Sequence, residues 1–333
     1  MSIKIKITPE MDELLVRSGS QDTVISATAT RQLTQALQEP LRAGIQAGDI
    51  TYDIFETVTL APDASPEFPL DLLRPGKEKD HVAYTIPNAG RIPERHVESD
   101  YVMIPTYEVG GSIDWLLKYP RHARWDVVGR AVEVLQGSFV KKDNDDAWHI
   151  IITSGVDRNI LVYDGDANAG QFTKRLVSLM KTIMRRNGGG NSASNNRGML
   201  TDVFISPEGV EDMRDWKVDQ VDEITRREIF VAQEGMLNRI FGVNIRDIDE
   251  LGVNQEYQNF FTSQLSGSLA SGDQELVVGL DLSKNDCFYN PVKQALELYD
   301  DPTIHRQRRQ GMYGWKEQGW GALDNRRTLL ASF

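Results

Sequence analysis

The chain has 333 residues, 40% hydrophobic and 26% charged, a composition typical of an ordinary soluble protein with one large or two ordinary domains. Its formal net charge of -12 argues against a dedicated nucleic-acid-binding protein. The single cysteine, Cys287, excludes disulfide frameworks, multi-thiolate zinc sites and paired redox cysteines within one chain. No apolar run is long enough for a transmembrane helix, and the first residues lack the order of a signal peptide, so nothing predicts secretion.

Residues 1–48 have the pattern of an arm rather than of a domain. Four apolar residues recur at a strict spacing of four: Leu33, Leu37, Leu41 and Ile45. This spacing predicts a short amphipathic helix over 30–47, although Pro40 makes two short helical pieces an equal alternative. Because such a segment cannot bury its apolar stripe alone, we expect it to lie on another surface.

The next sixty residues change to a strand-like pattern. Residues 51–60 alternate and are rich in β-branched side chains, which predicts a strand. Residues 61–80 are rich in proline, which is typical of an exposed loop. Further strands are expected at 82–86 and 101–109. Because this stretch has too few apolar residues for a core of its own, we expect 49–112 to be a projecting hairpin or a partly ordered insertion.

The longest regular pattern follows Pro120. Its apolar stripe consists of Val128, Val132, Leu135 and Phe139, and the pattern resumes at Ala147, Trp148 and Ile151. The spacing predicts a helix over about 123–153, ending near Gly155 and about 46 Å long at 1.5 Å per residue. The charged residues 141–146 interrupt the stripe, so we expect them to meet water or a partner chain. Two interpretations fit: a long helix in an α+β domain, or the backbone helix of a flat shell subunit.

The second half of the chain predicts shorter elements. A helix is expected over 169–187, with an apolar stripe at Phe172, Leu176, Leu179 and Ile183 that Met180 and Met184 widen. Residues 188–198 are of low complexity and are expected to be a mobile loop. A buried strand at 202–205 should lead into a helix capped by Ser206, with Pro207 in its first turn. Later strands are expected at 239–245, 276–282, 296–299 and 327–333.

One motif resembles a metal site and fails on inspection. Asp164, Asp166 and Asn168 have the 1, 3, 5 spacing of a calcium loop. However, Ala169 stands where that loop requires glycine, and Arg175 stands where it requires glutamate. A cation in place of the bidentate carboxylate disfavours calcium, so we interpret this segment as a turn entering a helix.

Other catalytic patterns are lacking. The glycines at 188–190 have no phosphate-loop ending, the five histidines form no metalloprotease motif, and Cys287 has no histidine nearby in sequence. We therefore assign no catalytic, cofactor-binding or metal-ligating residue and no cofactor.

The C-terminal segment 302–333 is basic on an otherwise acidic chain. It carries three aromatic residues, Tyr313, Trp315 and Trp320. The cations fit a nucleic-acid contact or packing on the acidic surface of a neighbouring copy, and we favour the second. The aromatic residues fit base stacking or anchors in a core or interface, and we again favour the second.

The order of elements resembles the major capsid protein of tailed bacteriophages, the HK97-like fold, over nearly the whole chain. Residues 203–216 are similar to the strand and helix that open the axial domain of that family, and residues 319–333 are similar to its closing segment. The resemblance implies an α+β fold. Its parts would be an N-terminal arm (1–48), an extended β-hairpin loop (49–112), a peripheral domain (113–199 and 294–333) with a spine helix at about 123–153, and a compact axial domain (200–293).

The resemblance also implies a structural, non-enzymatic role. The chain would assemble into hexamers and pentamers of an icosahedral head that encloses double-stranded DNA without sequence-specific binding. It would assemble in the host cytoplasm and reside in the virion, with scaffolding, portal and decoration or cement proteins as partners and no membrane. The arm would be too short for a scaffolding extension, so scaffolding would be cleaved off or separate.

The resemblance leaves two points open. The alternative to a phage head is an encapsulin-like nanocompartment that encloses a protein cargo. A lysine–asparagine cross-link like that of some members could use Lys77 or Lys79 with Asn325. The arm and the hairpin would be stabilised by lying on neighbouring subunits.

Overall fold

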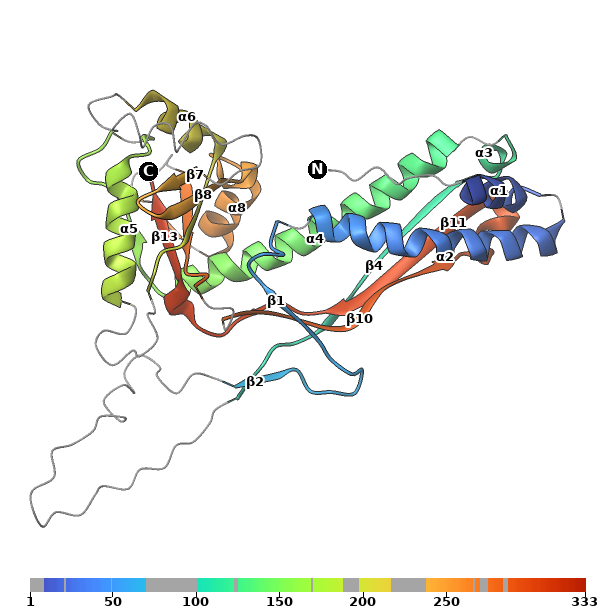
Figure 1. Cartoon of the computed structure of the whole chain (residues 1–333), viewed down its shortest axis with the longest axis horizontal. Helices are drawn as coiled ribbons and strands as arrows, with labels where there is room; N and C mark the ends of the chain where they lie inside the picture. Colours follow the sequence, from blue (N-terminus) through green and yellow to red (C-terminus); the bar gives the residue numbers. More distant parts are fainter. Residues whose placement is uncertain are drawn as a thin grey trace, which may run out of the picture. The chain divides into compact units, whose positions relative to one another are not determined.

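The computed structural model describes residues 9–20, 22–48, 50–69, 101–122, 125–168, 170–187, 198–216, 238–265, 267–269, 275–283 and 287–333 (Figure 1). The chain divides into two compact units. The first unit comprises Met1–Glu67, Met103–Ala147 and Tyr289–Gly321, and the second comprises Phe68–Val102, Trp148–Phe288 and Ala322–Phe333. No helix in the described ranges is long and apolar enough to cross a membrane.

The first unit consists of helices packed on a long-stranded sheet. The sheet has the order β1-β10-β11-β4, with β12 (Gly321–Ala322) beside β10. Its strands are β1 (Glu56–Thr59), β10 (Phe288–Asp300), β11 (Arg309–Gln318) and β4 (Tyr107–Leu116). Strand β1 is parallel to β10, whereas β10 and β11, and β11 and β4, are antiparallel. The helices are α1 (Pro9–Ser18), α2 (Thr23–Gly48), α3 (Lys118–Arg121), the short η5 (Pro302–Gln307) and the first part of α4 (Trp125–Asp157).

Helix α4 confirms the long helix and the stripe that its sequence predicts. Val128, Val132, Leu135 and Phe139 are each at most 2% exposed and pack with residues of α1, α2, β4, β10 and β11. The helix runs two residues past Gly155. Gly155 packs against β13 instead of ending the helix, since a Cβ there would lie 2.6 Å from Cγ of Leu330.

The expectation for residues 141–146 is half wrong. Lys141 and Lys142 are exposed, but Asp143 and Asn144 are buried, at 4% and 8% exposure. Asn144 Oδ1 accepts a hydrogen bond from the backbone N–H of Ile50 at 3.2 Å. Polar side chains can face the interior here because the fold supplies partners for them.

The helix predicted at 30–47 is one continuous helix, α2, and is longer than predicted. Helix α2 passes through Pro40, and Leu33, Leu37 and Leu41 are at most 1% exposed in the core of the first unit. The surface that the stripe needs is therefore supplied by this chain, rather than by a neighbouring subunit. Burial of leucines on both sides of Pro40 offsets the cost of a proline inside a helix, about 3 kcal/mol.

The strands after the arm are shorter than expected. Of 51–60 only Glu56–Thr59 is a strand, because residues 51–54 form a turn. The 101–109 prediction divides into β3 (Tyr101–Met103) and the start of β4, and β3 pairs with β2 (Glu67–Pro69) in a separate two-stranded sheet. The predicted strand at 82–86 lies outside the described residues.

The second unit is built on a sheet of order β5-β13-β9-β6-β8-β7. Its strands are β5 (Leu161–Val162), β13 (Thr328–Ser332), β9 (Leu276–Leu280), β6 (Asp202–Ile205), β8 (Val243–Asp247) and β7 (Asn238–Ile240). Its helices are α5 (Lys174–Asn187), α6 (Pro207–Asp215), α8 (Glu256–Asn259) and the end of α4, with the short η3 (Asp249–Leu251), η4 (Phe260–Gln264) and η6 (Asn325–Arg327).

Side chains of β6 alternate between two cores. Val203 and Ile205 pack in the cluster that contains α5, whereas the Phe204 ring lies 5.0 Å from that of Trp148 on the other face. The prediction for 202–205 is confirmed, as is the cap, because Ser206 Oγ accepts from the backbone N–H of Gly209 at 3.2 Å.

Other predictions for this unit need adjustment. Helix α5 starts at Lys174, not at residue 169, although Phe172 is still buried. The strand expected at 239–245 is a hairpin, because Phe241 and Gly242 have positive φ and reverse the chain. Strands β9 and β13 confirm the predictions at 276–282 and 327–333 within two residues, whereas β10 is far longer than 296–299. The loop predicted at 188–198 lies, apart from Gly198, outside the described residues.

Candidate functional site

The segment with calcium-like spacing is a turn that leads into α5. Thr173 Oγ1 donates to Asp164 Oδ2 at 2.8 Å, and the backbone N–H of Asp166 donates to Asp164 Oδ1 at 3.2 Å. Arg175, which stands where a calcium loop has its glutamate, pairs with Asp166 and lies 3.7 Å from Asp164. A guanidinium thus neutralises the acids, as expected for a structural turn.

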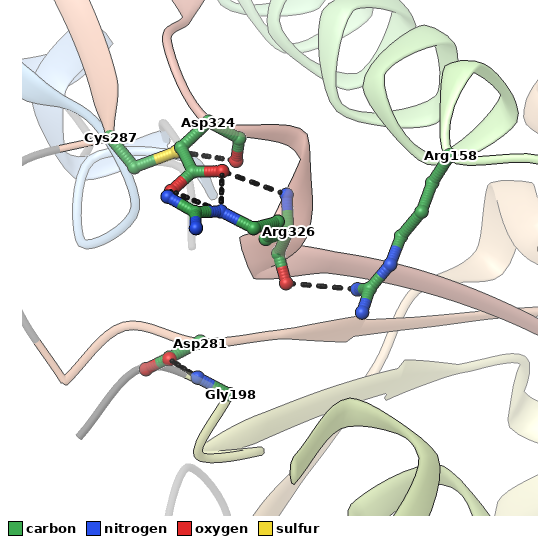
Figure 2. Close-up of polar contacts among 6 residues, drawn as sticks. All are labelled: Arg158, Gly198, Asp281, Cys287, Asp324 and Arg326. Carbon is green, nitrogen blue, oxygen red and sulfur yellow. Dashed lines mark hydrogen bonds and ion pairs between the residues drawn. The ribbon is translucent and has the colours of Figure 1, made fainter. Parts of the chain in front are cut away.

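Cys287 belongs to a polar cluster at the end of the second unit's sheet (Figure 2). Its thiol is buried and donates to the carbonyl oxygen of Asp324 at 3.1 Å. The Asp324 carboxylate accepts from the backbone N–H of Arg326 and holds its guanidinium through Nε at 2.9 Å and Nη2 at 2.8 Å. The thiol therefore serves as a small buried donor.

Arg158 ties the end of α4 to the same cluster. Its Nη1 donates to the carbonyl oxygen of Arg326 at 2.9 Å (Figure 2) and to that of Thr328 at 2.7 Å. Burial lowers the pKa of Arg158 from its usual value. A guanidinium that bridges two backbone carbonyls fixes the approach of η6 to β13, which is a structural task.

Asp281 completes this polar layer. Its Oδ2 accepts from the backbone N–H groups of Gly198 at 3.0 Å (Figure 2) and Met199 at 3.1 Å. Its Oδ1 accepts from Ser283. A fully buried carboxylate held by backbone donors positions the chain that enters β6.

Glu275 is a buried carboxyl whose pKa is raised. Burial, followed by the nearby Glu208 and Asp212, raises its pKa to about 7. Ser206 donates its hydroxyl to the Glu275 carboxylate. The group resembles a catalytic acid in its pKa, but its hydroxyl partner also caps α6, so its immediate contacts are structural.

In the first unit the basic C-terminal segment pairs within its own chain. Lys316 forms a buried ion pair with Asp143, and Gln318 Nε2 donates to the same carboxylate at 2.6 Å. Arg309 pairs with Asp114 at 2.9 Å. Lys316 and Arg309 therefore have acidic partners within the subunit, and the two interpretations left open by the sequence stay predictions for the other cations of this segment.

The aromatic residues of this segment take separate roles. The Trp320 ring is buried against Phe55, with 4.9 Å between the ring centroids. Tyr313 is 40% exposed and stacks on Tyr299, with 5.5 Å between the ring centroids.

A polar cavity of about 220 Å³ lies between α2 and β10, lined by residues that include Arg31, Gln35, Glu297 and Asp300. Of the cross-link candidates, Asn325 is exposed in η6, and Lys77 and Lys79 lie outside the described residues.

These contacts share one chemical character. The buried acids and cations bind backbone groups or one another, and among the described residues no cluster of three or more His, Cys, Asp or Glu side chains could hold a metal ion. Sequence reasoning missed Asp143, Arg158, Lys316 and Asp281, because their partners are distant in sequence.

In comparisons of sequence, no protein-family model and no curated protein matches the chain. Comparison of structures does find matches. The capsid of an empty GTA particle has a TM-score of 0.56 at 13% identity, with coverage of 86% of this chain and 90% of that chain. The cyanophage Pam1 capsid asymmetric unit has a TM-score of 0.54 at 12% identity, with coverage of 84% and 88%. The head structure of Helicobacter pylori bacteriophage KHP40 has a TM-score of 0.54 at 10% identity, with coverage of 86% and 90%.

These matches extend over more of the chain than either compact unit contains, so they include parts of both. The chain has the HK97-like capsid fold, as its order of elements predicts.

Proposed function

We propose that this chain is the major capsid protein of a tailed bacteriophage. It would assemble into hexamers and pentamers that close into an icosahedral head around double-stranded DNA, without sequence-specific contacts. The observation that supports this most is the shared fold with phage and GTA capsid chains over 84–86% of the sequence. The role is structural, and no catalytic, cofactor-binding or metal-ligating residue is assigned.

The contacts of the buried polar groups agree with a structural role. Asp281, Arg158 and Asp143 each bind groups far apart in sequence, which rigidifies a subunit without leaving a reactive group oriented toward solvent. Tyr101 and Met103 on β3 are 61% and 63% exposed. Adjacent exposed apolar residues of this kind are typical of surfaces that a partner covers.

We further propose the division into an arm (1–48), an extended loop (49–112), a peripheral domain (113–199 and 294–333) and an axial domain (200–293). This division describes roles in a shell. Packing within the subunit groups the chain differently, because 148–199 and 322–333 share a unit with 200–288.

Self-association is the first partner relation to test. Scaffolding, portal and decoration or cement proteins, the virion as location and assembly in the host cytoplasm follow from the same role. A protein-filled compartment has less support, since the matches described above are capsids of phages and a GTA particle.

Negative-stain microscopy of the purified chain, with light scattering of the same sample, tests this proposal. Hexameric or pentameric rings or closed particles are expected. A chain that stays monomeric at all concentrations and ionic strengths would contradict it. Nucleic acid extracted from particles made in infected cells would support a genome container, whereas a stoichiometric protein cargo would support the nanocompartment.

A further inference from the structure

Phe241 is exposed in a backbone conformation that bulky residues rarely adopt. It forms the two-residue tip of the β7–β8 hairpin with Gly242, and their φ angles are 51° and 76°. Positive φ at both positions is the requirement of a type I′ turn, for which Asn-Gly is favoured. The Phe241 side chain is 54% exposed. The subunit therefore bears a backbone cost there and buries little apolar surface in return.

The tip is held firmly against α5. Lys181 Nζ donates to the carbonyl oxygen of Phe241 at 2.6 Å. Behind the tip, Arg239 Nε donates to Asn244 Oδ1 at 2.8 Å across the hairpin. These bonds hold the backbone of the tip, from which the Phe241 side chain extends.

The tip contacts a helix rich in cations. Between residues 174 and 186, α5 carries five cations and no acid: Lys174, Arg175, Lys181, Arg185 and Arg186. Lys181, which donates to the tip, and Arg185 are one turn apart, on the same side of the helix, and both are exposed. We call Phe241, Lys181 and Arg185 the cationic patch. Aromatic and arginine side chains are enriched at interface centres.

A surface of opposite character lies at the other end of strand β8. Residues 247–256 follow β8 and include Asp247, Asp249, Glu250 and Glu256, with no cation. Within this loop Val253 is 37% exposed. We call Asp249, Glu250 and Val253 the acidic patch. The five residues of β8 separate the two patches, by about 17 Å at the usual rise of a strand.

We propose that the cationic patch of one copy docks on the acidic patch of the next, with the Phe241 ring against Val253. This inference rests on the proposed self-assembly. The charges identify the partner as a second copy, because each patch finds its complement in this chain. Since the patches differ and lie at opposite ends of one strand, the contact is heterologous, and its repetition generates a ring when the rotation between copies closes.

The first test replaces Phe241 with asparagine. Phe241→Asn creates the favoured Asn-Gly turn, so the subunit should melt at an unchanged or higher temperature. The yield of rings or particles should fall by at least about tenfold, the loss expected for a central aromatic anchor. The matched control is Tyr163→Asn, at another exposed aromatic residue of this unit. The Tyr163 side chain is 57% exposed, and this variant should assemble normally. Normal assembly of Phe241→Asn would overturn the proposal.

The second test detects the contact itself. In the double variant Lys181→Cys/Asp249→Cys, which keeps the Phe241 and Val253 side chains, oxidation of assembled material should give a ladder of covalent oligomers on a non-reducing gel. Each single variant can give at most a dimer, and native Cys287, 1% exposed, should not react. Assembled double variant without a ladder would overturn the proposal, even if Phe241→Asn failed for another reason.

Different outcomes contradict the proposed function and the proposed contact. A wild-type chain that does not self-associate contradicts the proposed function, and with it this contact. If the wild-type chain and Phe241→Asn both form particles, only the proposed contact is contradicted.

Discussion

Lys316 of β11 and Asp143 of α4 form a buried ion pair, with 8% and 6% of their side-chain surfaces exposed. Gln318 donates to the other oxygen of the same carboxylate, and the Lys316 ammonium lies 5.6 Å from the centroid of the Phe139 ring. The pair therefore joins the long helix to the sheet at the point where the charged stretch of the helix would otherwise face an apolar core.

Breaking this pair should cost more than breaking an exposed one. Lys316→Met leaves Asp143 buried without its cation, and we expect a loss of about 3–5 kcal/mol in the free energy of unfolding. Lys142→Met removes a half-exposed cation from its i,i+4 pair with Asp146 and should cost less than about 1 kcal/mol. Urea unfolding of both variants measures the difference. Equal costs would mean that the buried pair adds nothing beyond a surface contact.

Leu135 should contribute to the core far more than its neighbour in sequence. Leu135→Ala removes a side chain that is 2% exposed, and we expect a loss of about 2–5 kcal/mol, enough to prevent accumulation of soluble protein. Val134→Ala, at 52% exposure, should stay near wild type. Expression level and melting temperature are compared. A soluble Leu135→Ala chain with unchanged melting would show that the helix faces are wrongly assigned.

Two glycines of α4 should respond oppositely to alanine. At Gly155 an added Cβ would meet Cγ of Leu330 at 2.6 Å, so Gly155→Ala should destabilise the chain by about 1–3 kcal/mol. At Gly137 a Cβ would meet nothing within 4 Å, so Gly137→Ala should stabilise the helix by about 0.5–1 kcal/mol. Thermal melting of the two variants decides this, and a shift in the same direction for both would refute it.

Glu275 should make the second unit more stable in mild acid. Its folded-state pKa of about 7 lies above the unfolded value of 4.5, so the folded chain binds this proton more tightly. This stabilisation is complete below about pH 4.5 and disappears as the pH rises through 7. The difference corresponds to about 3 kcal/mol at most.

Glu275→Gln should remove that dependence. We expect the variant to melt higher than wild type at pH 8, and the two melting curves to converge toward pH 5. Glu211→Gln, at an exposed acid of α6, is the control and should keep the wild-type pH profile. If Glu275→Gln also keeps it, Glu275 titrates at its ordinary pKa in the folded chain.

The sequence alone determined the elements whose information is local. The stripe from Val128 to Phe139 determines which face of α4 is buried, because apolar residues spaced three to four positions apart all lie on one face of a helix. Ser206 and Pro207 fix the start of α6 for a similar reason, since a cap involves only its own first turn. The order of such elements sufficed to indicate the HK97-like fold.

Only the tertiary structure decided the positions where partners are distant in sequence. Strand β11 has inward-facing residues that include Gln310, Lys316 and Gln318, and these polar side chains are buried only because Thr30 and Asp143 bind them. Helix α2 continues through Pro40 because leucines on both sides of it are buried against other elements. A local pattern indicates which secondary structure a segment favours. Whether a charge can be buried, or a helix can continue through a proline, depends instead on stabilising contacts with segments distant in sequence.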